Sequence, residues 1–271
     1  MRKPNFTSSN RYLRNEKAKN QKKLKINKVI TNKVLIEAHR IQGIFISKGV
    51  IDNLLTRQLE SGKNLYDDRK VTVTDSEAVD YYTWNPFKSK MAAAILSGAD
   101  DIYFRLNSKV LYIGASNCSN LCHISDVIGP GGFLFALCKN MHNDILYAAN
   151  QRTNIFPIIA NPLHPGTYSI QMILVDTIIC DISSFTTPEM ISENAKRYLR
   201  DRGNLVLFVN AEKIDKTVAA ESLYALQINN LKSFNFVPKS KIYLHPYFTN
   251  CAMLTFEYRS TKSMKKNNSK K

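Results

Sequence analysis

The alternation of short apolar runs with helix-like polar stretches along residues 109–209 limits the possible folds more than any other feature. Strands of a parallel sheet are buried on both faces, so they read as continuous apolar runs, and consecutive strands need a crossover between them. The pattern therefore predicts an α/β fold with a mainly parallel sheet covered on both faces. The runs that we expect to form strands lie at 109–113, 133–137, 155–159, 173–180, 205–209 and 252–258.

Helices are expected between these runs. They should extend to about residue 128, cover 144–151 and cover 189–199, where Gly203 is predicted to stop the last one. Residues 34–84 instead favour short strands, such as 44–46 and 71–74, and predict a small β-rich unit. We divide the chain accordingly into a tail at 1–31, a small β-rich domain at 32–84, an α/β domain at 85–259 and a tail at 260–271.

The positive charge is concentrated at the two ends. Residues 1–28 carry ten Lys or Arg and one acid, residues 259–271 carry six and no acid, and the whole chain has a net charge of +16. The body between them is thus nearly neutral. Basic tails attract polyanions such as RNA by counterion release, without sequence specificity. Such tails can equally well serve nuclear import or keep the protein in solution. Both interpretations, RNA attraction and an import or solubilising tail, suit a nuclear protein.

No stretch suggests a membrane span, a disulfide framework or a metal site. The longest apolar candidate, 172–182, is interrupted by Asp176 and Asp181 and is shorter than the roughly 20 residues that cross a bilayer. The five cysteines include no CxxC pair, which favours free thiols in a reducing compartment. The five histidines show no metal-ligand spacing. We therefore expect no membrane association and no bound metal.

Polar residues follow two of the predicted strands, at the edge where open parallel sheets bind ligands. The segment 114–120 reads GASNCSN, and its glycine allows a tight turn after the first strand. This loop is either a nucleotide-like ligand site or an ordinary turn into a helix. Asp181 ends the run at 173–180, where its carboxylate can orient a substrate hydroxyl or cap the next helix, and its position alone favours the cap.

A longer segment carries a family resemblance. Residues 84–96 read WNPFKSKMAAAIL and are similar to the WNPF(R/K)SKLAAAI segment of the fibrillarin family. Further motifs match in the same order, over about 32–258. They include His39, Arg40, Gly43 and Phe45 upstream, and 109–114, 123–130, 152–157, 164–165, 175–176, 214–217 and 246–247 downstream.

The resemblance implies a Rossmann-like S-adenosylmethionine-dependent methyltransferase domain preceded by the small β-rich domain. It implies transfer of a methyl group to RNA ribose 2′-hydroxyls within box C/D ribonucleoproteins, where a guide RNA selects the site. The implied partners are guide snoRNA, rRNA and box C/D scaffold proteins, and the implied location is the nucleolus of the nucleus.

The catalytic positions implied by the resemblance are only partly kept. The family uses two lysines, an aspartate and a histidine, and Lys90 and Asp181 match the first lysine and the aspartate. The second lysine position is Asn210, which cannot supply a positive charge, and the histidine position is Cys251. Two of the four side chains therefore differ.

The implied cofactor positions are altered as well. Cys118 replaces a glycine of the family's loop, Cys138 replaces its acidic residue, Lys139 an aromatic one, and Asn161 an aspartate. The residues assigned to cofactor binding are Gly114, Ala115, Ser119, Asn120, Cys138, Lys139, Asn161, Pro162, Asp181, Ile182, Ser183 and Ser184. A lost hydrogen bond costs on the order of 1 kcal/mol, so three or four losses weaken binding by roughly 10²–10⁴-fold.

We therefore expect a member of the fibrillarin family with an eroded cofactor and catalytic site. The alternative is a catalytically inactive structural or RNA-binding paralogue that keeps the ribonucleoprotein contacts. The altered catalytic and cofactor positions favour this alternative for the chemistry, and the family resemblance is the same for both. A general basic RNA-binding protein would need only the tails, and the long match in register argues against it.

Overall fold

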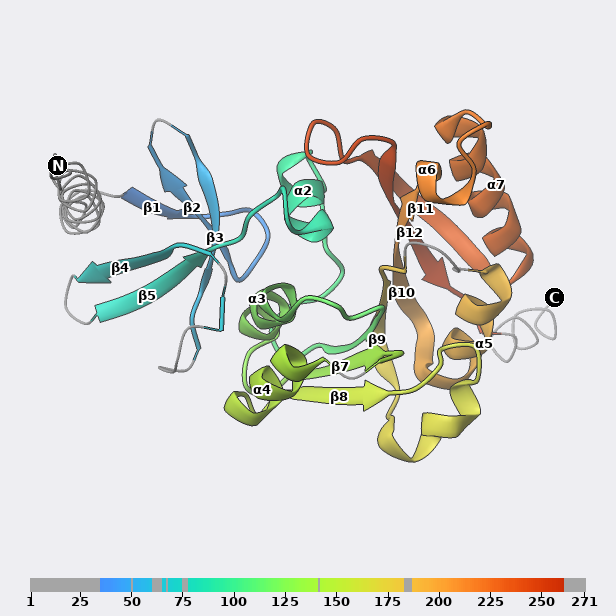
Figure 1. The fold of residues 1–271 in the computed structure, drawn as a ribbon, viewed down its shortest axis with the longest axis horizontal. Coiled ribbons are helices and arrows are strands. Elements are labelled where there is room, and N and C mark those ends of the chain that lie inside the picture. The colour runs from blue at the N-terminus through green and yellow to red at the C-terminus, as the bar shows by residue number, and fades with distance from the viewer. Residues whose placement is uncertain are drawn as a thin grey trace, which may run out of the picture.

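The computed structural model describes residues 35–49, 51–59, 65–66, 68–74, 78–140, 142–182 and 187–260. Except for Ser260, the predicted tails at 1–31 and 260–271 lie outside these residues. The chain forms two sheets, with helices α2 (Lys90–Leu96) and α3 (Cys118–Ile128) between them (Figure 1). No helix in the described part of the chain is both long and apolar enough to cross a bilayer.

The N-terminal sheet has five antiparallel strands in the order β1-β2-β3-β5-β4. The predicted strands at 44–46 and 71–74 fall within it. Ile44 and Leu54 are buried, and they anchor the sheet to the neighbouring helices. The strands are β1 (Leu35–Ala38), β2 (Ile44–Lys48), β3 (Asn53–Arg57), β4 (Lys70–Thr74) and β5 (Ala78–Thr83).

The second sheet has seven strands in the order β11-β12-β10-β9-β6-β7-β8. Five of them are parallel, and β12 and β11 add an antiparallel edge. This confirms the predicted α/β class with a small β-rich part before it. The strands are β6 (Lys109–Ile113), β7 (Phe133–Cys138), β8 (Ile155–Ile159), β9 (Val175–Cys180), β10 (Leu199–Asn210), β11 (Phe236–Tyr243) and β12 (Cys251–Tyr258).

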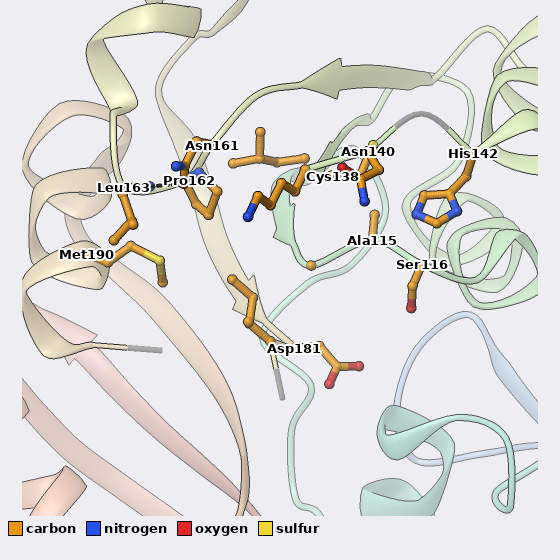
Figure 2. A pocket seen from close by; sticks show the side chains of 14 residues that line it. Ala115, Ser116, Cys138, Asn140, His142, Asn161, Pro162, Leu163, Asp181 and Met190 are labelled. Atoms are coloured by element: carbon orange, nitrogen blue, oxygen red, sulfur yellow. Dashed lines mark hydrogen bonds between the residues drawn. The ribbon is translucent and has the colours of Figure 1, made fainter. Parts of the chain in front are cut away.

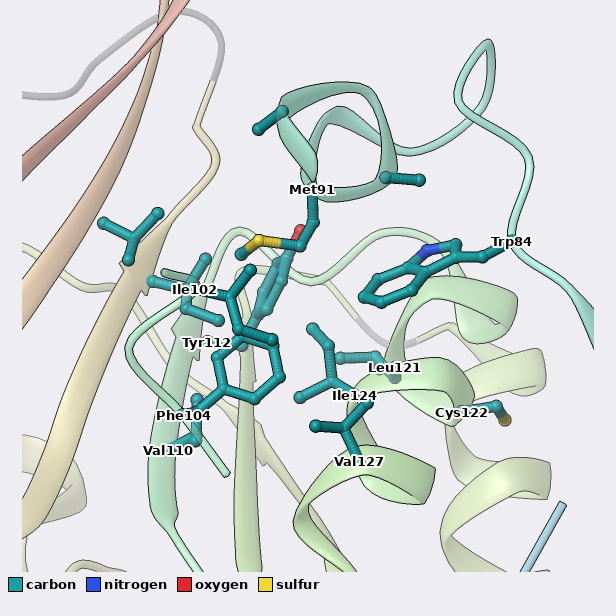
Figure 3. Packing of buried hydrophobic residues seen from close by; sticks show 14 of the residues in the cluster. Trp84, Met91, Ile102, Phe104, Val110, Tyr112, Leu121, Cys122, Ile124 and Val127 are labelled. Atoms are coloured by element: carbon teal, nitrogen blue, oxygen red, sulfur yellow. The ribbon is translucent and has the colours of Figure 1, made fainter. Parts of the chain in front are cut away.

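Helices cover both faces because alternate residues of each strand point to opposite sides. In β6, Val110 and Tyr112 join the apolar cluster under α2 and α3, and Leu111 joins the cluster on the opposite face. Figure 3 shows the first cluster, in which Trp84 and Met91 pack over α3. The remaining helices are α4 (Asn143–Gln151), α5 (Pro188–Tyr198), α6 (Ala211–Ile214) and α7 (Ala220–Ser233), with a 3₁₀ segment at Pro165–Gln171.

Gly203 has a different role from the one predicted. Helix α5 ends at Tyr198, and the chain enters β10 directly, with an irregular register between Leu199 and Asn204. A Cβ on Gly203 would lie 2.6 Å from Cδ1 of Leu199. The glycine therefore permits the bulge in the strand, where close packing excludes a side chain.

A buried polar cluster joins the N-terminal sheet to helix α3. The Asp126 carboxylate of α3 accepts hydrogen bonds from Nη1 of Arg152 at 2.7 Å, from Oγ1 of Thr56 at 3.1 Å and from the hydroxyl of Tyr66. His123, also on α3, contacts Oγ1 of Thr56 through Nδ1 at 2.7 Å. Since Thr56 and Tyr66 belong to the N-terminal part, this cluster fixes that part on α3.

Candidate functional site

A cavity of about 570 Å³ opens at the carboxyl ends of β6, β7, β8 and β9. In Figure 2, Asn161, Pro162 and Leu163 line one side and Ser116, Asn140 and His142 the other, with Asp181 below them. Its lining also includes Gly114, Ala115, Leu137, Cys138, Lys139, Ile182 and Met190. The position is the one expected of a ligand site in an open parallel sheet.

Gly114 makes the turn that opens this cavity. Its φ is +94°, a conformation that favours glycine, and a Cβ there would lie 2.7 Å from the carbonyl oxygen of Asp181. The glycine thus lets the chain leave β6 in close contact with the end of β9. Cys118, in contrast, does not line this cavity: it begins α3, and its thiol donates to the carbonyl of Leu65 at 3.5 Å.

Where the family has an acidic residue, this chain has a neutral thiol that already makes a hydrogen bond. Cys138 ends β7, and its Sγ donates to the carbonyl of Ile158 at 3.6 Å. Burial raises the pKa of the Cys138 thiol, so it stays protonated at neutral pH. Among the described residues that line the cavity, only Asp181 bears a carboxylate.

Asn161 holds the loop after β8 in shape. Its Oδ1 accepts a hydrogen bond from the backbone N–H of Leu163 at 3.1 Å, which forms a local turn. An amide oxygen has a second lone pair, and the amide nitrogen has two protons to donate. Asn161 therefore keeps polar contacts to offer a ligand in the cavity.

Lys90 and Asp181 form an ion pair at the cavity edge. Lys90 is the first residue of α2, which Ser89 caps by accepting from the backbone N–H of Ala92 at 3.3 Å. Its Nζ donates to Oδ1 of Asp181, and the two side chains are 19% and 18% exposed. The structure therefore brings these two predicted residues together, although 91 residues separate them in the chain.

Tyr112 and Asn120 support the pair from behind. The Tyr112 hydroxyl donates to Oδ2 of Asp181 at 3.0 Å and accepts from Nδ2 of Asn120 at 2.9 Å. Oδ1 of Asn120 accepts from Oγ of Ser89 at 2.7 Å and from Nε1 of Trp84 at 3.2 Å. Burial, followed by the Asp181 charge, raises the pKa of Tyr112 well above its usual value, so Tyr112 remains a donor.

Two residues assigned to cofactor binding thus lie elsewhere. Asn120 is buried and uses both the oxygen and the nitrogen of its amide in the network behind Asp181, and Oγ of Ser119 donates to Oδ2 of Asp68 at 3.0 Å. Neither lines the cavity. Ser183 and Ser184 lie outside the described residues. The other assigned residues, from Gly114 to Ile182, do line the cavity.

Asn210 and Cys251 face each other across β10 and β12, where they are paired in register. Oδ1 of Asn210 accepts from the backbone N–H of Lys213 at 3.3 Å and so caps α6. Cys251 is 3% exposed, and burial raises the pKa of its thiol while the nearby Lys90 lowers it. Asp181 directly follows β9, Asn210 ends β10 and Cys251 begins the antiparallel β12, so these three positions lie at one edge of the sheet, where Lys90 pairs with Asp181.

Sequence reasoning missed several residues of the cavity and of its support. Ser116, Asn140, His142 and Leu163 lie in the loops after β6, β7 and β8, and treating every loop at a strand end as a site would have found them. Tyr112 carried no such signal, because it reads as a core residue of β6. In the part of the chain that the structure describes, no three His, Cys, Asp or Glu side chains are placed to hold a metal.

Comparisons with known proteins agree with this geometry. The family model described as Fibrillarin matches residues 36–260. The rRNA 2′-O-methyltransferase fibrillarin of Xenopus laevis is 36% identical over 237 residues, which cover 86% of this chain and 73% of that protein. Aeropyrum pernix fibrillarin, solved with natively bound S-adenosyl-L-methionine, has a TM-score of 0.74 and 26% identity over 83% of this chain and 99% of its own.

A chain in a solved fibrillarin/Nop5p complex is also similar, with a TM-score of 0.68 and 25% identity over 84% of this chain and all of that one. The sequence match and the structural match therefore both extend over most of the chain. The resemblance carried by the motifs from Trp84 onward is confirmed: the chain belongs to the fibrillarin family.

Proposed function

We propose that this chain is an RNA ribose 2′-O-methyltransferase of the fibrillarin type that uses S-adenosylmethionine and turns over slowly because its site is eroded. The observation that carries the proposal is the Lys90–Asp181 pair, which Tyr112 holds at the edge of the cavity. A carboxylate next to an ammonium group is suited to orient a hydroxyl and to stabilise the charge that develops on its oxygen.

The cavity fits the cofactor in position and size but not in every contact. Its volume of about 570 Å³ lies within the range of ligand pockets, and Gly114 keeps side-chain atoms away from the turn after β6. The loop at Gly114–Ala115, the Asn161 amide and the apolar Ile182 would hold the cofactor, which supplies an electrophilic methyl group when bound. Cys138 offers a ribose no carboxylate, so we expect weakened binding.

Each residue of the site then has its own role toward the substrate. Asp181 accepts the proton of the ribose 2′-hydroxyl in a hydrogen bond and orients the oxygen. Lys90 stabilises the negative charge that develops there. Asn210 provides no second cation, and its amide is already used as a helix cap. Removing one charge stabiliser commonly costs about 10²–10³ in rate.

The proposed setting is a box C/D ribonucleoprotein that processes rRNA in the nucleolus. The name of the Xenopus laevis relative specifies rRNA, and the fibrillarin/Nop5p complex supports a scaffold-protein partner. Guide RNA and substrate RNA complete the proposed assembly. The basic ends of the chain suit an RNA-rich compartment.

A second candidate function is that of a structural paralogue without turnover. Cys251 favours it, because a buried neutral thiol cannot take the part of a histidine in proton transfer. The fold and its protein contacts would then be retained while the chemistry is lost.

Calorimetric titration with S-adenosylmethionine tests the cofactor proposal. We expect a dissociation constant well above the low micromolar range, and low micromolar or tighter binding would contradict the eroded site. Catalysis is tested in an assembled guide-RNA complex with labelled cofactor. The triple variant Cys138→Glu, Asn210→Lys, Cys251→His should gain ribose methylation over its parent, and adding Asp181→Asn should abolish that gain.

A parent chain that already methylates RNA as fast as its relatives would overturn the eroded-site account. A triple variant that stays silent while binding the cofactor tightly would favour the structural paralogue.

A further inference from the structure

The charged side chains that line the cavity lie at two separate places. Asp181 follows β9, and its carboxylate is neutralised by the pair with Lys90. Lys139 follows β7, lines the cavity and is exposed. Since β6 lies between β9 and β7 in the sheet, about 10 Å separates the ends of these two strands. Among the described residues, no ion pair holds Lys139. The cavity therefore keeps one uncompensated cation, at the end of β7.

The loop after β7 adds hydrogen-bond donors to this cation. Asn140 and His142 also line the cavity, and both are exposed. An amide group has two N–H donors, and an imidazole ring has at least one. Cys138, before them, donates its thiol to the carbonyl of Ile158 at 3.6 Å and bears no negative charge. The loop thus presents a cation and N–H donors to the cavity, which is the set that binds a phosphate group.

A further carboxylate lies close in sequence but not in the same cavity. Asp144, two residues after His142, lines a separate hollow of about 320 Å³ together with Cys118 and Tyr147. An anion beside Lys139 therefore shares the cavity with a single carboxylate among the described lining residues, Asp181, at the other end and already paired.

The end of β7 is the place where nucleotide-binding sheets contact a ribose. Gly114 makes the turn after β6, and β7 is the next strand along the chain. In dinucleotide-binding sheets an acidic side chain at the end of this second strand accepts a hydrogen bond from a ribose hydroxyl, whereas a nearby cation accommodates a phosphate on that hydroxyl. The combination of Cys138 and Lys139 corresponds to the second case.

The opposite side of the cavity suits a planar base. Pro162, Leu163 and Met190 provide apolar surface there, and Asn161 lies beside them (Figure 2). An amide side chain can both accept and donate a hydrogen bond at the edge of a base. The volume of about 570 Å³ has room for a nucleotide.

We propose that the cavity binds a free nucleotide whose ribose carries a phosphomonoester on its 2′ or 3′ oxygen, with Lys139, Asn140 and His142 around that phosphate. This inference rests on the proposed function for the assignment of an adenosine ligand to the cavity. It goes further, because S-adenosylmethionine has no phosphate. The nucleotide and the cofactor occupy the same cavity, so each excludes the other and bound nucleotide slows methylation.

Calorimetric titration of the full chain with the 2′, 3′ and 5′ isomers of adenosine monophosphate tests this proposal. The isomers have the same composition and the same charge at neutral pH, so attraction to the basic ends of the chain is equal for all three. The better of the 2′ and 3′ isomers should bind about 10-fold tighter than the 5′ isomer or more, because a hydrogen bond to a charged group contributes such a factor.

Substitutions assign this preference to the loop. Lys139→Gln should remove it, whereas Lys232→Gln, at an exposed lysine in the last turn of α7, should keep it. Cys138→Glu should weaken binding of the preferred isomer and strengthen binding of S-adenosylmethionine, because a carboxylate repels a phosphate and accepts hydrogen bonds from ribose hydroxyls.

Equal binding of the three isomers, or a preference that persists in Lys139→Gln, would overturn this inference. Binding of S-adenosylmethionine without any preference among the isomers would reject it and leave the proposed function standing. A preference for the 2′ or 3′ isomer in a chain that does not bind S-adenosylmethionine would support the inference and reject the proposed function.

Discussion

The Tyr112 hydroxyl donates to Oδ2 of Asp181 at 3.0 Å, while Lys90 pairs with Oδ1 of the same carboxylate. Both oxygens of Asp181 are therefore held, one by a residue of the sheet and one by a residue of α2. This arrangement keeps the carboxylate in a fixed orientation even though it is partly exposed. Substitutions of the residues that hold Asp181 show how much this arrangement contributes to stability.

Replacing Tyr112 by phenylalanine keeps the buried ring but removes the hydroxyl. The Asp181 carboxylate and the Asn120 amide each lose a partner, so we expect destabilisation of about 1–3 kcal/mol. Urea unfolding measures this loss. Tyr243→Phe is the control, because the Tyr243 hydroxyl donates to Glu221 at the surface, and its midpoint should not move. Equal shifts for the two variants would show that Tyr112 does not support Asp181.

Substitution of Arg152 should be among the most destabilising changes in the chain. Arg152→Met leaves the Asp126 carboxylate buried without its cation, which commonly costs about 3–5 kcal/mol. The double variant Arg152→Met, Asp126→Leu should recover much of that loss, because no charge is then stranded. Lys196→Met, at the surface pair with Glu193, serves as control and should have little effect. A small loss of unfolding free energy in Arg152→Met would contradict a buried Arg152–Asp126 ion pair.

Stability should fall on mild acidification because of His123. Burial is the largest influence on the pKa of His123 and lowers it below the usual 6.5, against the opposing charges of Asp68 and Asp126. Below about pH 6.5 the unfolded chain therefore binds a proton that the folded chain excludes, and unfolding becomes easier as pH falls. Melting temperatures at pH 7.5, 6.5 and 5.5 measure the effect.

His123→Gln should lose less stability than the parent between pH 6.5 and 5.5. His142→Gln is the matched control, since it removes an exposed imidazole that lines the cavity. Parallel pH profiles for the parent and His123→Gln would place the titrating group elsewhere.

The basic ends should dominate nonspecific RNA affinity. Deleting residues 1–28 and 260–271 removes most of the net positive charge, so fewer counterions are released on binding and the dependence of affinity on salt should flatten. Lys48→Gln with Lys70→Gln is the control, because these side chains pair with Asp52 and Asp80 in the folded body. An unchanged salt slope after the deletion would indicate a concentrated basic patch on the body.

The parallel strands could be predicted from sequence because burial on both faces leaves a direct mark. In β6, Val110 and Leu111 are both apolar since each faces a covered side of the sheet. Asp181 could be predicted for a related reason, as a polar residue that interrupts an apolar pattern at a strand end. Both inferences use the local pattern of apolar and polar residues, which can be read from the sequence without knowledge of the fold.

Contacts between distant segments could not be predicted in this way. Asn120 at the start of α3 was assigned to a ligand, yet its amide is used by Trp84, Ser89 and Tyr112. Gly203 was interpreted as a helix stop, yet it permits a strand bulge. In both cases the residue type indicated a polar contact or an unusual backbone correctly. The partner depended on which elements the fold brings together.

The cap formed by Asn210 bears on how readily this chain could regain a lysine at that position. The amide of Asn210 closes α6, and losing such a cap costs on the order of 1 kcal/mol. A lineage that returns to lysine therefore loses stability at the first step, and it gains rate only if the rest of the site is also repaired. The hydrogen bond that caps this short helix thus opposes the replacement of Asn210 by lysine.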